Sequence, residues 1–221
     1  SAQLEKPGFA INPYFYRSHV TYEAELEHIV FKSWLYAGHI SQVAKNGDYF
    51  LFDVGEDSII ISRDNKGQIG AMHNICRHRG ARVCEEPSGN RKAFICPYHG
   101  WAYGNDGHLK SAREMDQLEG FKCEDYALKK VRFVVFQGMI FINCDPNAPD
   151  FIAPLENISR QLGAYDLENA KVAERKTYRI NANWKLVLEN YLECYHCSSS
   201  HRQDAKRHTL VAPSEKLNPI N

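Results

Sequence analysis

Two short segments, each with one Cys and one His, constrain this chain more than any other part of its sequence. Cys76 and His78 form the first pair, and Cys96 and His99 form the second pair after residues 79–95. Two Cys and two His indicate either a zinc site or an iron–sulfur cluster. Zinc sites usually separate paired ligands by about two to four residues, and a Cys-x-His pair is too tight for that pattern. The spacing therefore favours an iron–sulfur cluster held between two loops.

The ligand set fits a Rieske [2Fe–2S] centre, in which two thiolates bind one iron and two imidazoles bind the other. Two loops that each supply one Cys and one His provide this set. Neutral imidazoles in place of thiolates leave the cluster less negative, which raises its reduction potential above that of plant-type ferredoxins. The sequence therefore predicts a [2Fe–2S] cluster on Cys76, His78, Cys96 and His99, rather than two buried cysteines and two ordinary histidines.

The composition is that of a folded protein with no bias toward a charged partner. Hydrophobic residues make up 43% of the 221 residues, and 27 Lys and Arg balance 27 Asp and Glu, so neither nucleic acid nor an anionic membrane surface is indicated. The most apolar run, residues 133–142, is too short for a membrane helix. The start lacks Met and any secretory pattern, so we expect a trimmed N-terminus and a cytoplasmic location.

The middle third of the chain has the pattern of short strands between Gly, Asn and Asp turns. The expected strands are 49–54, 58–63, 69–74, 93–96 and 131–144. Residues 22–36 carry apolar side chains at helical spacing, which predicts an amphipathic helix before these strands. We therefore expect a compact antiparallel β domain with a helical segment in front of it.

Prolines at 146, 149 and 154 mark a linker after the β domain. Beyond it we expect a short helix at 155–162, a strand at 171–180, and a helix from about Trp184. The expected organisation has three parts: an N-terminal helical segment at 1–40, the cluster domain at 41–150, and the start of a further domain at 151–221.

Both cluster loops resemble those of a known family. They read Cys76-Arg77-His78-Arg79-Gly80 and Cys96-Pro97-Tyr98-His99-Gly100-Trp101. This pattern is similar to that of the Rieske non-heme iron oxygenases, the alpha subunits of ring-hydroxylating dioxygenases and related mono-oxygenases. Respiratory-chain Rieske proteins carry a further Cys in each loop, where this chain has Ala81 and Tyr98. The resemblance is therefore to the oxygenases and not to the respiratory proteins.

Residues 183–201 resemble the mononuclear iron helix of the same family, with Asn183-Trp184-Lys185 at its start. By that match His196 and His201 are ligands of an Fe(II) ion in a site of two His and one carboxylate. A five-residue offset puts two side chains about 140° apart on a straight helix, so we expect a break within residues 198–200. The family's third ligand lies well over a hundred residues further on, so we expect this chain, which ends at Asn221, to be incomplete. Asp204 and Glu215, the acids after His201, do not have that spacing.

Two other interpretations of this segment remain open. Cys194 and Cys197 have a Cys-x-x-Cys spacing, so zinc on Cys194, His196, Cys197 and His201 is the rival metal site. The segment also fits a pair of exposed histidines with no metal. Zinc would leave the Asn-Trp-Lys stretch unexplained.

The resemblance implies an α+β fold, with an antiparallel β Rieske domain ahead of a helix-grip α+β catalytic domain that this chain only begins. It implies that a flavin or iron–sulfur reductase, or a ferredoxin, passes electrons from NADH or NADPH to the cluster. The cluster then passes these electrons to the mononuclear Fe(II), where O₂ is activated and a small organic substrate is oxygenated. It also implies a homotrimer.

The residue at position 193 indicates which class of substrate to expect. Residues 184–199 are more similar to oxygenases of quaternary ammonium compounds (choline, glycine betaine, stachydrine) than to arene dioxygenases, which usually carry Asp where this chain has Glu193. This predicts hydroxylation of an N-methyl group and oxidative demethylation. The alternatives are an aromatic ring-hydroxylating dioxygenase and, from another class, a Rieske ferredoxin-type electron carrier. In related oxygenases a carboxylate at this place lies at a subunit boundary. By that resemblance Glu193 links His196 of its own subunit to His99 of the next.

Overall fold

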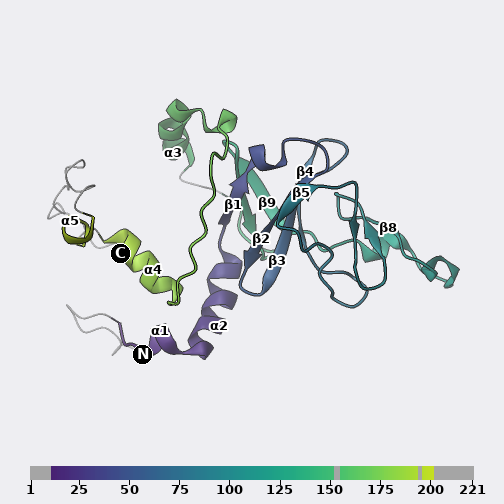
Figure 1. Cartoon of the computed structure of the whole chain (residues 1–221), viewed down its shortest axis with the longest axis horizontal. Coiled ribbons are helices and arrows are strands. Elements are labelled where there is room, and N and C mark those ends of the chain that lie inside the picture. The colour runs from purple at the N-terminus through teal and green to yellow at the C-terminus, as the bar shows by residue number, and fades with distance from the viewer. Residues whose placement is uncertain (1–10, 152–154, 194–195, 202–221) are drawn as a thin grey trace. The chain divides into compact units, whose positions relative to one another are not determined.

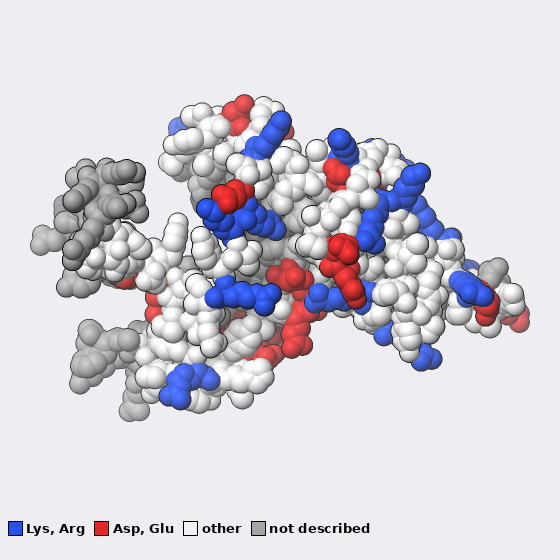
Figure 2. Space-filling model, viewed as in Figure 1, with Lys and Arg blue, Asp and Glu red and all other residues white. Residues whose placement is uncertain are grey.

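The computed structural model describes residues 11–151, 155–193 and 196–201. The chain forms two compact units, one of residues 24–176 and the other of residues 1–23 together with 177–221. Within the described residues, no helix is long and apolar enough to cross a membrane. On the face seen in Figure 2, basic and acidic side chains are interspersed, as the zero net charge suggests.

The unit of residues 24–176 is built from three antiparallel sheets (Figure 1). Their strand orders are β1-β10-β9, β4-β3-β2-β5 and β6-β7-β8. The strands are β1 (Leu35–His39), β2 (Asp48–Val54), β3 (Asp57–Arg63), β4 (Ile69–His73), β5 (Ser88–Asn90), β6 (Phe94–Ile95), β7 (Ala102–Tyr103), β8 (Leu109–Ser111), β9 (Arg132–Phe136) and β10 (Met139–Asn143). The expected antiparallel β architecture is therefore confirmed.

Strand β3 joins the two hydrophobic cores of this unit, because it is buried on both faces. Side chains on a strand alternate between its faces. Ile59 and Ile61 accordingly lie in one core, with side chains of β1 and β10. Ile60 lies in the other core, with Trp101 and Phe94 and the two cluster cysteines. The cluster loops are thus anchored in the interior of the sheet structure.

A tight turn divides the region 131–144, for which the sequence indicated one strand. That expectation is wrong: β9 ends at Phe136 and β10 begins at Met139, and the two strands pair as a hairpin. Gln137 and Gly138, with φ of 48° and 78°, form the two-residue loop. A loop with two positive φ values suits the right-handed twist of a hairpin. Gln seldom adopts this conformation, so the turn has little local signal.

The helix expected at 22–36 is shorter and begins earlier. Helix α2 spans His19–His28, a 3₁₀ turn covers Val30–Lys32, and β1 already begins at Leu35. From Leu35 the chain forms a strand because β1 pairs with β10, as at Leu35↔Ile142, and this pairing outweighs the helical spacing of the local sequence. The expected amphipathic face is also absent, since Leu26 is the one buried residue of α2.

The remaining helices are short. They are α1 (Tyr14–Arg17), α3 (Leu155–Leu162), α4 (Trp184–Leu192), α5 (Cys197–Ser200) and 3₁₀ turns at Ile40–Val43, Met115–Gln117, Cys123–Tyr126, Gly163–Tyr165 and Leu167–Asn169. The helix expected at 155–162 and the helix expected from Trp184 are confirmed as α3 and α4. The strand expected at 171–180 is wrong, because these residues pair with no strand in the described part of the chain.

Candidate metal centres

The two cluster loops have the same backbone hydrogen bonds. The N–H of Cys76 donates to the carbonyl of Ala81, and the N–H of Gly80 donates to the carbonyl of Cys76, at 2.8 and 3.0 Å. In the second loop the N–H of Cys96 donates to the carbonyl of Trp101 and the N–H of Gly100 to that of Cys96, again at 2.8 and 3.0 Å. Two different sequences therefore close into the same tight turn, each with a Cys at its base.

Glycine ends both turns because the backbone there is left-handed. The φ values are 77° at Gly80 and 72° at Gly100. A side chain strains this conformation, whereas glycine adopts it freely. Open space surrounds both positions, so backbone conformation and not crowding requires glycine there. These turns place His78 and His99 at the tips of the loops, above the buried cysteines.

The two thiols lie together in the core. Cys76 and Cys96 are both buried in one hydrophobic core, and after burial itself the neighbouring Cys76 contributes to the raised pKa of Cys96. The hydroxyl of Tyr103 is 3.3 Å from Cys76 Sγ and accepts the N–H of Arg77 at 3.1 Å. With its lone pair taken by that N–H, the Tyr103 hydroxyl is set to donate to a Cys76 thiolate. Burial raises the pKa of Cys96, so a bound cation is needed to hold that sulfur as a thiolate.

The two imidazoles form a second pair. The rings of His78 and His99 are 4.6 Å apart at 68°. The indole of Trp101 stacks beneath His78 at 4.9 Å and 10°, and the ring of Tyr98 lies 3.8 Å from that of His99. Burial, followed by repulsion from His99, lowers the pKa of His78, so its ring is neutral and able to ligate.

These side chains fit a two-iron cluster better than a single ion. Within the described residues no three His, Cys, Asp or Glu side chains gather closely enough for one metal ion, as zinc would require. The ligands instead divide into a thiol pair and an imidazole pair, which is the division that a Rieske centre needs. Nδ1 of His78 is buried and has no hydrogen-bond partner in the described structure, which is costly unless a ligand satisfies it.

The second candidate centre follows α4 in the other unit. Glu193 caps the C-terminus of α4, and its carboxylate oxygen lies 2.5 Å from Nδ1 of His196. The rings of His196 and His201 are 5.3 Å apart. His196 and His201 flank the short helix α5, which makes the pair possible despite their five-residue offset. The break expected within 198–200 is wrong, because these residues belong to α5 and the N–H of His201 still donates to the carbonyl of Cys197 at 2.9 Å. The helix ends earlier instead, since α4 stops at Leu192.

A carboxylate on Nδ1 prepares His196 for metal binding. It holds the ring in one tautomer and leaves Nε2 free for a metal. The donor set of two neighbouring imidazoles with one such carboxylate therefore fits an Fe(II) ion that takes its remaining ligands from elsewhere. The rival zinc ligand Cys194 and the acids Asp204 and Glu215 lie outside the described residues.

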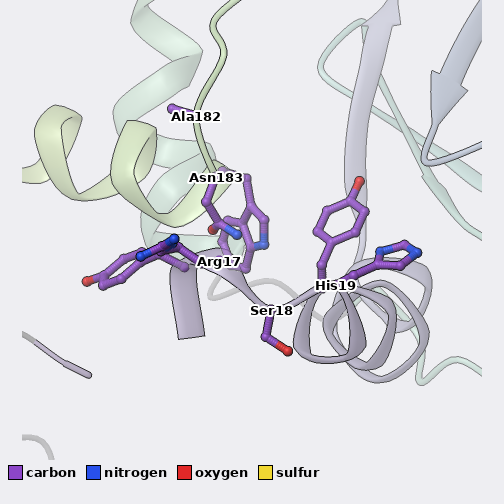
Figure 3. Close-up of a pocket in the computed structure, with 8 residues that line it drawn as sticks. Arg17, Ser18, His19, Ala182 and Asn183 are labelled. Carbon is purple, nitrogen blue, oxygen red and sulfur yellow. The ribbon is translucent and has the colours of Figure 1, made fainter. Parts of the chain in front are cut away.

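A hollow of about 460 Å³ lies in the same unit, at the start of α4. Figure 3 shows Arg17, Ser18 and His19 from the junction of α1 and α2, with Ala182 and Asn183 from the segment that leads into α4. The side chain of Asn183 caps α4 by accepting the N–H of Lys185 at 3.0 Å. None of the residues that line this hollow is an expected metal ligand.

Sequence reasoning missed two supporting contacts. The first is the contact of Tyr103 with Cys76, which the spacing of two buried aromatic residues, Trp101 and Tyr103, could have indicated. The second joins α1 to α4: the Tyr16 hydroxyl lies 2.8 and 3.0 Å from the two carboxylate oxygens of Glu189. The side chain of Lys185 lies over the Tyr16 ring at 5.6 Å. No local pattern connects residues so far apart in the chain.

Two family models match the chain in order. The Rieske [2Fe–2S] domain matches residues 33–122, and the ring hydroxylating alpha subunit (catalytic domain) matches residues 167–216. The glycine betaine monooxygenase oxygenase subunit of Pseudomonas aeruginosa is 40% identical over 96% of this chain and 48% of its own length. The biphenyl 2,3-dioxygenase subunit alpha of Rhodococcus jostii is 34% identical over 86% of this chain and 43% of its own.

Solved structures of similar proteins have the same fold. The crystal structure of a quaternary ammonium Rieske monooxygenase in complex with L-carnitine matches with a TM-score of 0.79 and 33% identity. The match covers 88% of this chain and 56% of that one. This chain spans about half the length of the curated relatives it matches.

Proposed function

Because this chain belongs to the Rieske non-heme iron oxygenases, we propose that it is part of a terminal oxygenase that hydroxylates an N-methyl group of a small quaternary ammonium compound. The hydroxylated methyl group would leave as formaldehyde, so the overall reaction would be an oxidative demethylation. The observation that carries this proposal is the presence of both donor sets in one chain. A Rieske ferredoxin-type carrier would need only the cluster loops and would have no use for the Glu193–His196–His201 arrangement.

The residues of this chain would divide the work between the two centres. Cys76, His78, Cys96 and His99 would hold the [2Fe–2S] cluster, and His196 and His201 would hold Fe(II) together with a carboxylate from outside the described residues. When bound, these groups supply single-electron transfer and O₂ activation. The protein would contribute positioning, tuning of the potential and exclusion of side reactions. For this, the Trp101 ring fixes His78, the Tyr103 hydroxyl reaches Cys76, and the Glu193 carboxylate orients His196.

The substrate class follows from the relatives. The glycine betaine enzyme is 40% identical to this chain, against 34% for the biphenyl dioxygenase. The Glu at position 193 supports the same choice, since arene dioxygenases of the resembled family usually carry Asp there. An aromatic ring-hydroxylating dioxygenase is therefore the second candidate.

We also propose a homotrimer in which Glu193 of one subunit bridges its own His196 and His99 of the next subunit. The physical reason is that the free N–H of a cluster imidazole needs an acceptor, and a shared carboxylate would couple the two centres. Electrons would come from NADH or NADPH through a reductase or ferredoxin. The proposed domain boundaries are 1–40, 41–150 and 151–221, and the order of the two family matches supports this arrangement.

The proposal is tested with purified protein, a reductase and NADH under air. Glycine betaine and carnitine should stimulate O₂ consumption and release formaldehyde. Benzoate or biphenyl should give neither. Stimulation by arenes with formation of cis-diols and no formaldehyde would support the second candidate instead. Cluster reduction without any substrate-dependent O₂ uptake would indicate the electron carrier.

A further inference from the structure

A hollow of about 470 Å³ lies beside the first cluster loop, and cationic side chains surround it. Arg77 and Arg79 from the loop line it together with Lys129 from the segment before β9. All three side chains are exposed, and none forms an ion pair within the described part of the chain. These charges are therefore available to a partner.

The hollow has a net positive charge. Asp57 is the one acid among its lining residues, against the three cations. The remaining titratable neighbour outside the cluster ligands is His73, whose pKa is lowered by burial, so it adds no charge near neutral pH. The whole chain has 27 basic and 27 acidic residues, so this charge is local and would attract an anionic partner to one place.

The hollow that His99 lines has no comparable charge. Tyr98, His99 and Gly100 line a separate hollow with Arg113 and Glu114, whose charges pair at 3.3 Å. Of the hollow lined by His78 and the hollow lined by His99, only that of His78 has an excess of cationic side chains. The two imidazoles therefore face different electrostatic surroundings. His99 is the imidazole that the proposed trimer uses for Glu193, which leaves the His78 side for another partner.

We propose that the hollow lined by Arg77, Arg79 and Lys129 docks the electron donor, an acidic carrier protein whose redox centre has carboxylates around it. This inference rests on the proposed function, since it supposes that the loops hold a redox cluster. Docking here would bring the donor's redox centre next to the His78 imidazole, a short path to the cluster. One electron leaves the reduced donor and is taken up by the oxidised cluster, and no bond forms or breaks. Complementary charge mainly raises the association rate, so the effect should appear in that rate and in its dependence on salt.

The structure provides a matched control for a charge change. Strands β3 and β4 form an antiparallel pair, and Asp57 and His73, which line the hollow, lie at one end of this pair. Lys66 lies in the turn that joins the two strands at the other end. Five residues of β4, at about 3.3 Å each, separate the two ends. Lys66 is exposed like Lys129, so Lys66→Glu makes the same change of charge far from the hollow.

The test measures reduction of the oxidised cluster by a pre-reduced, acidic plant-type [2Fe–2S] ferredoxin in a stopped-flow instrument, at low and high ionic strength. Lys129→Glu should lower the second-order rate constant roughly tenfold at low salt, and Arg79→Gln should lower it less. Both variants should weaken the salt dependence. Lys66→Glu should change the rate less than about twofold. Dithionite, a small reductant, should reduce the cluster fully in every variant.

The outcomes separate this inference from the proposed function. Equal ferredoxin rates for Lys129→Glu and Lys66→Glu, with full reduction by dithionite, would overturn the docking site and leave the oxygenase proposal intact. A changed oligomeric state of Lys129→Glu in size-exclusion chromatography, with an unchanged ferredoxin rate, would also overturn it, because the hollow would then be a subunit contact. Unmodified protein without a dithionite-reducible cluster would overturn the proposed function itself.

Discussion

The two units support their candidate centres in different ways. In residues 24–176, both cluster cysteines belong to a buried core with Trp101 and Phe94. In the other unit, α4 has no buried residue. Its exposed apolar side chains are Leu186, Val187, Leu188, Tyr191 and Leu192. Within the described residues, the first centre therefore rests on a closed hydrophobic core, and the contacts that position the second are individual polar ones.

This difference predicts which changes each centre tolerates. Around the cluster, packing and repeated backbone hydrogen bonds fix the loops, so loss of one ligand should remove the cluster without unfolding the sheets. Around His196, the Glu193 carboxylate and the Tyr16–Glu189 contact carry the positioning. Single polar substitutions there should change function more than stability.

The largest effect is expected from Cys76→Ser, which removes a cluster ligand. The variant should lose the red-brown colour, the iron–sulfur absorbance and the EPR signal of mixed His and Cys ligation, because a serine oxygen does not replace the thiolate. Cys84→Ser is the matched control, since Cys84 is equally buried in the same core and should leave the spectrum unchanged. Unmodified protein that is colourless and holds only stoichiometric zinc would contradict the assignment.

The next effect separates the two centres. His196→Ala should remove the mononuclear iron and all turnover, because only His201 would remain of the two imidazoles. The [2Fe–2S] spectrum should persist, since its ligands lie in the other unit. Iron analysis together with EPR measures both in one sample. His19→Ala changes an exposed histidine of the same unit and is the control. Full activity of His196→Ala would show that His196 is no ligand.

A smaller effect is expected from Glu193→Gln, which keeps the shape of the side chain and removes its charge. Both metals should remain bound, while product formation should fall by about 10–100-fold, as is typical when a carboxylate partner of a ligating His is lost. Formaldehyde release per O₂ consumed is the measurement, with metal content confirmed. Glu189→Gln is a control, because a Gln oxygen still accepts the Tyr16 hydroxyl. Normal turnover in Glu193→Gln would make Glu193 an ordinary surface residue.

The sequence alone led to candidate ligands, which stay a prediction, and it missed the side chains that support them, for physical reasons. Cys76, His78, Cys96 and His99 carry unusual chemistry at close spacing, so local sequence is sufficient to identify them. Strands β2, β3 and β4 were predicted within a residue or two, because turns with Gly and Asp bound them. Strand β1 was missed because its pairing with β10 depends on residues about a hundred positions away.

The same reasoning explains which parts of the second centre could be predicted from the sequence. His196 and Glu193 were found by their likeness to a family motif, and their contact confirms that they lie together. The role of Glu193 between subunits stays a prediction. The end of α4 at Leu192 has no Gly or Pro to signal it, so local propensity indicated a helix through to the serines. The Tyr16–Glu189 contact joins the two ends of the chain and has no local signal.

Tyr103→Phe should shift the potential of the cluster without removing it. Its hydroxyl lies 3.3 Å from Cys76 Sγ, and a hydrogen bond to the sulfur stabilises the more negative, reduced cluster. Its loss should lower the reduction potential by on the order of 50 mV, since about 1.4 kcal/mol corresponds to about 59 mV for one electron. A redox titration followed by EPR measures this. Tyr126→Phe, which changes another ring against Trp101, is the control. An unchanged potential in Tyr103→Phe would show that the hydroxyl does not donate to Cys76.

The smallest effect concerns stability at alkaline pH and again depends on the closed core. Burial raises the pKa of Tyr49 to about 12, from an ordinary value of 10. The folded protein therefore binds this proton more tightly than the unfolded chain does. The stability that Tyr49 contributes is fully present below pH 10 and is lost as pH rises from 10 through about 12. Two pKa units correspond to about 3 kcal/mol, so this is the upper limit of the loss.

Tyr49→Phe should remove this part of the loss of stability at alkaline pH, because Phe has no proton to release. Urea unfolding followed by circular dichroism at pH 8, 10 and 11.5 measures it as the difference in unfolding free energy between the variant and unmodified protein. Tyr165→Phe is the control, since Tyr165 is 73% exposed and lies in the same unit. The variant's stability should fall less steeply with pH than that of unmodified protein and of the control. Parallel curves for all three proteins would mean that Tyr49 ionises without leaving the core, and that the core around the cluster loops is less closed than its packing indicates.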